Sequence, residues 1–183
     1  MILGKEYFSA PATTLAPDLL GKFICRRTDE GVVRARIVET ECYFGEEDTA
    51  CHAHKGRTKR TMPMYEEGGI TYVYLCYGMH YMLNIVTGRY NHPEAVLIRG
   101  VESAVGPGRC TKLFNITTAD NALPLSKESG IWIEDDMSPP PEFTATPRIG
   151  IGYADQCDQD KKWRFVVKQT SHTTNSTAIS RKI

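Results

Sequence analysis

The sequence has no apolar stretch approaching the roughly 18 consecutive residues of a membrane-spanning helix. Its start lacks the basic and then apolar segments of a secretory signal, so we expect an intracellular protein in the cytoplasm, nucleoid or nucleus, with no membrane partner. No repeat or linker divides the 183 residues, which predicts a single domain over 1–183. We also expect a monomer.

The six cysteines include no Cys-x-x-Cys pair and are irregularly spaced. That spacing argues against a zinc site and predicts free thiols in a reducing compartment.

The chain also lacks a charge excess, with 22 basic and 22 acidic residues. This balance argues mildly against nucleic acid as a partner, because phosphate binding normally leaves a basic excess. The charges are unevenly spread, however. Residues 52–60 hold four Lys/Arg and no acid, and 161–164 form a second basic cluster. Such runs are most often solvated surface, so phosphate contact is the alternative interpretation.

Apolar periodicity and turn residues predict an α+β fold, in which short helices flank a mixed, mostly antiparallel β-sheet. We expect helices from a cap at Thr13 or Thr14 through Leu20, with Pro17 in the first turn, and over 109–114. Strands are expected at 23–27, 32–43, 70–75, 82–87, 95–101, 131–134 and 164–168. Residues 138–147 are expected to be irregular, and 170–183 to be a frayed tail. The polar segment 45–69 is too long for a simple connection, which is typical of functional loops.

Two carboxylates share one face of the predicted strand over 32–43. Alternation places Glu39, Glu41 and Tyr43 together. Mutual repulsion can raise the pKa of one acid, and a carboxylate in a dry pocket is a suitable general base for water. On these residues alone, a solvated strand face remains the simpler interpretation.

Residues 70–81 contain four tyrosines. Alternation places Tyr72 and Tyr74 on one face, and Tyr77 beside Gly78 is expected to project from a turn. Aromatic faces of this kind can stack on a nucleobase. The alternative is that the tyrosines pack the core of a hairpin.

Taken together, motifs along the chain resemble those of the alkyladenine (3-methyladenine) DNA glycosylase family. The similar segments, in order, are 19–21, 36–43, 47–48, 50–52, 68–84, 96–99, 106–109 and 147–152. The likeness covers residues 8–168. Departures occur at 61–65, in the shorter segment 100–106, at Arg109 and after 170, all outside the matched catalytic positions.

The resemblance implies a monofunctional enzyme that removes a damaged purine from double-stranded DNA. Glu41 would deprotonate the attacking water, and Arg99 would help to hold that water. No lysine matches a nucleophile position, so the resemblance implies no Schiff base and no strand cleavage. Since water would be the nucleophile, it also implies no metal and no organic cofactor.

The resemblance also implies binding roles. Tyr43, His52 and Tyr74 would line the base pocket, and Asn84 would guard its floor against the amino group of guanine. Tyr77 would insert into the duplex where the lesion has left. The candidate phosphate contacts are Lys55, Arg57, Lys59, Arg60 and Arg109.

Two other functions remain open. A nucleic-acid-binding module without catalysis would keep the tyrosines and the basic loop but would not need Glu41 or Arg99. A metal-dependent hydrolase would use His52, His54 and a cysteine or Glu41. A nucleophilic pair of Cys51 and His52 is disfavoured, because adjacent residues rarely face each other.

Overall fold

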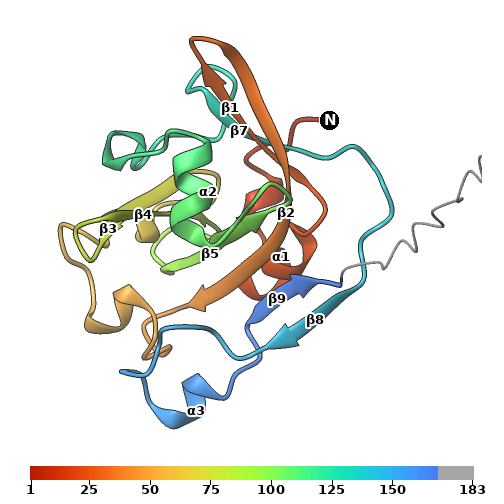
Figure 1. Ribbon diagram of the computed structural model, residues 1–183. Helices are drawn as coiled ribbons and strands as arrows, with labels where there is room; N and C mark the ends of the chain where they lie inside the picture. The colour runs from red at the N-terminus through yellow and green to blue at the C-terminus, as the bar shows by residue number, and fades with distance from the viewer. Residues whose placement is uncertain (169–183) are drawn as a thin grey trace, which may run out of the picture.

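The computed structural model describes residues 1–168, so the expected frayed tail at 170–183 lies outside the described residues. One antiparallel sheet forms the centre of the molecule, and its strands follow the order β3-β4-β5-β2-β1-β7 (Figure 1). The strands of this path are β1 (Phe23–Thr28), β2 (Gly31–Phe44), β3 (Thr71–Cys76), β4 (His80–Val86), β5 (Glu94–Val101) and β7 (Ile131–Glu134). The expected α+β class and these strands are confirmed within one or two residues.

The 14-residue strand β2 joins the two halves of the sheet. Its first half pairs with β1 through the expected hairpin, where Thr28 lies opposite Gly31. Its second half pairs with β5 and also with β9 (Arg164–Val167). The register with β5 shifts on both sides of Glu39, and such bulges re-aim the side chains around them.

Helix α1 (Ala12–Asp18) has Pro11 at its N-cap position, so the expected cap at Thr13 or Thr14 is wrong. A carboxylate from a distant strand caps the start of this helix, because the Ala12 N–H donates a hydrogen bond to Glu94 of β5. Pro17 consequently lies near the end of the helix rather than in its first turn. The second helix, α2 (Pro107–Leu113), begins two residues before the predicted start, with proline at its first position.

The expectation that 138–147 is irregular is wrong for β8 (Phe143–Thr146), which pairs with β9. This pairing comes from tertiary contact, and the proline-rich local sequence gives no sign of it. The sequence also gave no indication of β6 (Ala104–Val105), which pairs with β5, or of α3 (Gln156–Gln159). None of the helices within residues 1–168 reaches the length and hydrophobicity of a membrane span.

The two faces of the sheet have different roles. On one face, α1 packs on β2 and β5, and α2 packs on β4 and β5 (Figure 1). The core side chains contributed by the sheet to this side include Val73, Leu83, Ile85, Val96 and Ile98. The long segment 45–69 is anchored to the sheet by a second cluster, which contains Cys51, Ala53, Met64, Tyr65 and Tyr72. This segment includes the short helices η2 (His52–Lys55) and η3 (Met62–Tyr65).

We predict that the turn tyrosine contributes little to folding. Phe114 is completely buried, so Phe114→Ala should lower the free energy of unfolding by about 3–5 kcal/mol. Tyr77 is 87% exposed, so Tyr77→Ala should change it by less than about 0.5 kcal/mol. Urea denaturation measures both. A comparable loss in the two variants would instead place Tyr77 in the hairpin core.

Candidate active site

Residues from four strands line up across the sheet. Tyr72 of β3 lies opposite Asn84 of β4, Asn84 lies opposite Leu97 of β5, and Leu97 lies opposite Glu41 of β2. Directly opposed residues present their side chains on the same face. Since the side chains of Val73, Ile85 and Val96 in the same strands enter the main core, this row lies on the other face, beneath segment 45–69.

Glu41 has no solvent-exposed surface. Its Oε1 accepts the Ile149 N–H at 2.8 Å, and its Oε2 accepts the Tyr43 hydroxyl at 2.9 Å. Burial raises the pKa of Glu41, while Arg99 and the two hydrogen bonds oppose that rise. A carboxylate whose pKa is raised in this way is, once ionised, a stronger base than a solvated carboxylate.

Arg99 links the two acids of β2. Its Nε donates to Glu39 at 3.0 Å, and its Nη1 donates to Glu41 at 3.4 Å. The predicted shared face of Glu39 and Glu41 is therefore confirmed. Burial has the largest effect on the pKa of Glu41 and repulsion by Glu39 the smallest, so the expected repulsion is only a minor cause. Glu39 also accepts Arg164 Nε at 2.6 Å, a partner that the sequence did not indicate.

A small pocket opens beside Glu41. The pocket is lined by Tyr43, Ala50, His52, Met64, Tyr72, Tyr74, Asn84 and Tyr153. All four residues expected at a base pocket are thus brought together. Tyr43 connects the pocket to Glu41, because it lines the former and its hydroxyl donates to the latter.

The aromatic rings of the pocket hold each other in place. His52 lies 4.5 Å from Tyr74 between ring centroids, and its Nδ1 is 3.0 Å from the Tyr72 hydroxyl. Burial and the nearby Arg60 lower the pKa of His52 to about 4. The imidazole is therefore neutral at neutral pH. Asn84 is also fixed, because its Nδ2 donates to the Tyr72 carbonyl at 3.1 Å.

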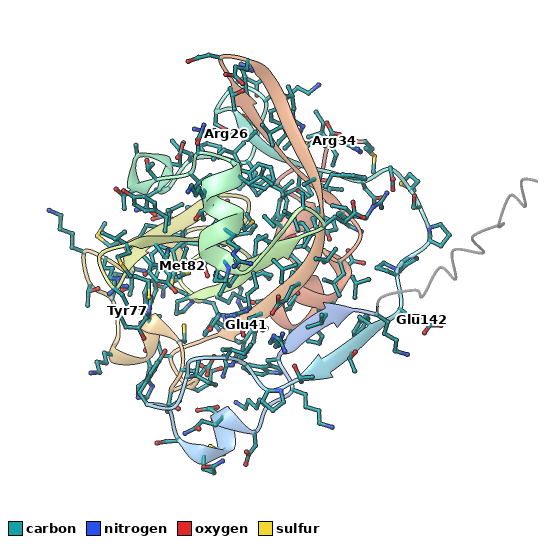
Figure 2. The ribbon with its side chains drawn as sticks, in the orientation of Figure 1. Arg26, Arg34, Glu41, Tyr77, Met82 and Glu142 are labelled. Carbon is teal, nitrogen blue, oxygen red and sulfur yellow. The ribbon has the colours of Figure 1, made fainter. Side chains whose placement is uncertain are left out.

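Tyr77 lies outside the pocket. It occupies the turn between β3 and β4 with a φ of 50°, and Gly78 follows with a φ of 68°. Its side chain is 87% exposed, and Figure 2 shows it at the left edge of the molecule, whereas Glu41 lies nearer the centre. The predicted position at a turn is confirmed.

The five basic side chains expected to contact phosphates fall into two groups. Arg57 donates to Asn91 at 2.6 Å and lies over the Tyr65 ring, and Arg60 lies 5.0 Å from the centroid of Tyr74. By contrast, Lys55, Lys59 and Arg109 are exposed, and none of them forms a side-chain hydrogen bond, an ion pair or a ring contact within residues 1–168.

In the second basic cluster, Lys161 pairs with Asp158 at 2.6 Å, and Arg164 pairs with Glu39. Part of its charge is therefore neutralised within the protein.

The residues considered as ligands of a metal-dependent hydrolase do not come together at one site. Within residues 1–168, no three His, Cys, Asp or Glu side chains are arranged to hold a metal ion. His54 contacts the carbonyl oxygen of Glu46, whereas His52 contacts Tyr72. Burial raises the pKa of the Cys51 thiol to about 12, which leaves it protonated and poorly nucleophilic.

Sequence reasoning assigned no role to several residues around Glu41. Ile149 supplies a backbone N–H to Glu41, and Tyr153 lines the pocket while its hydroxyl donates to the Ala50 carbonyl. Asp48 and Arg148 form a buried ion pair next to them. Asp48, Arg148 and Ile149 lie in the recognised motifs and Tyr153 directly follows one, but these contacts span about 100 positions of the chain.

The sequence matches a known protein family and several known proteins. A family model described as methylpurine-DNA glycosylase matches residues 6–105 and 102–171. The chain is 42% identical over 178 residues to a protein of Borrelia garinii subsp. bavariensis, covering 91% of this chain and 96% of the relative. It is 41% identical over 187 residues to one of Bdellovibrio bacteriovorus, covering 92% and 96%. A third, of Psychrobacter cryohalolentis, is 38% identical over 205 residues, covering 96% and 95%. All three are named as candidate 3-methyladenine DNA glycosylases.

We predict that His52 titrates near pH 4 rather than near its ordinary 6.5, and that Arg60→Gln raises this pKa by removing a neighbouring cation. Imidazole NMR signals followed against pH measure both values. The folded-state pKa is depressed, so folding stability linked to His52 should be lost as the pH falls from about 6.5 through about 4. A midpoint near 6.5 in the wild-type protein would show that the imidazole is solvated and free to charge.

Proposed function

The chain belongs to the methylpurine-DNA glycosylase family, and on this premise we propose that it hydrolyses the N-glycosidic bond of alkylated or deaminated purines in DNA. One observation carries the proposal. The fully buried carboxylate of Glu41 is hydrogen-bonded to Tyr43, which in turn lines an aromatic pocket. The site thus places a base for water beside a pocket lined by aromatic rings.

Recognition begins with extrusion of the damaged nucleotide, because its glycosidic bond is inaccessible inside a duplex. Tyr77 occupies the vacated place in the stack, where its exposed ring contacts the neighbouring bases. Lys55, Lys59 and Arg109 contact phosphates directly. Arg57 and Arg60, which already lie over tyrosine rings, contact phosphates at the mouth of the pocket.

The pocket then selects the base. Alkylation at N3 or N7 makes a purine cationic, and each aromatic face that it contacts favours the cation by roughly 0.5–2 kcal/mol. Because His52 is neutral, it adds no positive charge to the lining of the pocket. Asn84, held by its bond to Tyr72, blocks the space that the amino group of guanine would need.

Hydrolysis follows at C1′ of the deoxyribose. As the bond to the purine nitrogen breaks, its electron pair leaves with the base, and the sugar gains oxocarbenium character. Glu41 accepts a proton from water while the water oxygen bonds to C1′, and Arg99 orients that water beside Glu41. The products are the free base and an intact strand with an abasic site. Water is the nucleophile, so the reaction needs no Schiff base, metal or organic cofactor.

We predict that Glu41→Gln, which keeps the shape of the side chain but not its basicity, slows excision by a factor on the order of a hundred or more. Single-turnover rates are measured on duplexes that each carry one lesion: 3-methyladenine, 7-methylguanine, hypoxanthine or ethenoadenine. Binding to a duplex with a stable abasic-site analogue serves as the control and should change little.

The same assay separates the alternatives. A binding module without catalysis would release no base from any duplex. A metal-dependent hydrolase would lose activity in EDTA and regain it with zinc, whereas we expect activity in EDTA and an uncut strand. Excision by Glu41→Gln at the wild-type rate would remove Glu41 from the mechanism.

We predict that Tyr77→Ala impairs extrusion of the base but not pocket chemistry. Stacking of a base on an aromatic ring contributes about 1–3 kcal/mol, so the extruded population should fall roughly tenfold to a hundredfold. The loss of excision rate should be largest when the lesion is well paired. It should shrink opposite a mismatch, where extrusion costs less.

Tyr74→Ala provides the contrast, because Tyr74 lines the pocket and should affect paired and mismatched duplexes alike. An equal defect of Tyr77→Ala on both duplexes would contradict its assignment as the wedge.

A further inference from the structure

A buried ion pair lies beside Glu41 without belonging to the pocket lining. Arg148 Nη1 is 2.6 Å from Asp48 Oδ2, and Arg148 Nη2 is 2.8 Å from Asp48 Oδ1. Neither side chain has any exposed surface. Removing two charges from water is costly, and well-packed apolar residues often stabilise a fold equally well. Stability alone is therefore a weak reason for this pair.

Asp48 is held at the end of β2. Its carboxylate accepts the N–H groups of Phe44 and Ala50, each at 3.2 Å. Arg148 reaches the strand itself, because its Nη1 also donates to the carbonyl of Cys42 at 2.9 Å. Its guanidinium carbon lies 4.9 Å from the ring centroid of Tyr43. Arg148 thus joins its own segment to β2 at the residue between Glu41 and Tyr43.

The residues next to Arg148 in the chain show which backbone group its contacts with β2 hold in place. Pro147, Ile149 and Gly150 are exposed, so Arg148 is the buried anchor of this short stretch. The next residue along the chain, Ile149, places its N–H 2.8 Å from Glu41 Oε1. With Oε1 occupied in this way, Tyr43 and Arg99 contact Oε2.

We infer that Arg148 and Asp48 are positioning residues for the general base, because their ion pair holds the backbone of Ile149 against Glu41. This inference rests on the proposed role of Glu41 in hydrolysis. The hydrogen bond from Ile149 favours the ionised carboxylate and so lowers the pKa of Glu41 against the dominant effect of burial. Loosening the ion pair should therefore raise that pKa and move the acid limb of the pH–rate profile to higher pH.

Arg148→Lys tests the inference, because lysine keeps the charge but cannot form two parallel bonds with Asp48. Because the variant acts through the pKa of Glu41, we expect single-turnover excision at pH values below the acid limb to fall by about tenfold for each unit by which that pKa rises. The rate should approach the wild-type value as the pH rises. Ile149→Pro removes the N–H itself while keeping both Arg148 and Asp48 in the sequence, so it should shift the acid limb in the same direction. It also provides the test if Arg148→Lys does not fold.

Arg26→Lys is the matched control. Arg26 also forms an internal ion pair, with Asp120 at 2.9 Å, but it lies far from Glu41 in Figure 2. It should lower stability without moving the acid limb. Binding of a duplex with a tetrahydrofuran abasic analogue should be retained in all variants.

A double-mutant comparison provides a second readout. In the Glu41→Gln background, Arg148→Lys should cause little further loss, because it acts through a carboxylate that is no longer there. An equal loss in both backgrounds, or an unmoved acid limb in Arg148→Lys and Ile149→Pro, would overturn the inference. The proposed function fails separately, if the wild-type protein releases no base or Glu41→Gln retains the full rate.

Discussion

The cost of burying Glu41 is the constraint on which the site depends. A carboxylate without solvent contact must be protonated or must find charged and hydrogen-bonding partners. Here the partners come from three parts of the chain: Arg99 of β5, Tyr43 of β2 itself, and the backbone of Ile149. A sheet with this strand order brings β2 and β5 together, and the buried contact of Arg148 with β2 adds the third part.

These partners offset only part of the effect that burial has on the pKa of Glu41. Arg99 divides its hydrogen bonds between Glu39 and Glu41, and Glu39 is further compensated by Arg164. Glu41 therefore does not have an arginine to itself, and burial still raises its pKa. On the opposite side of Tyr43, the pocket contains neutral rings only, because burial keeps His52 uncharged and raises the pKa of Tyr74. The proposed chemistry needs both properties: a base that can take a proton, and a cavity that does not repel a cationic purine.

The features of the fold and the site that could be predicted from the sequence are those that depend on residues close together in the chain. The shared face of Glu39 and Glu41, that of Tyr72 and Tyr74, and the turn at Tyr77 follow from period-two alternation and one glycine, which are local patterns. The gathering of His52 and Asn84 at one pocket came from the family resemblance. The capping of α1 by Glu94, the pairing of β8 with β9, and the contact of Ile149 with Glu41 depend on residues far apart in the chain. No local pattern specifies such contacts.

The balanced formal charge illustrates the same limit. Counting residues argues mildly against a nucleic-acid partner, because the acids equal the bases. Many of these charges cancel inside the protein, however, as in the pairs Arg148–Asp48, Arg26–Asp120 and Arg164–Glu39. Internal pairs remove equal numbers of both signs from the field that a ligand meets, whatever the total. Phosphate attraction depends on the distribution of the remaining cations, and Lys55 and Lys59 lie in the segment that also supplies His52 to the pocket. A neutral chain can therefore present a locally basic surface where the proposed substrate would enter.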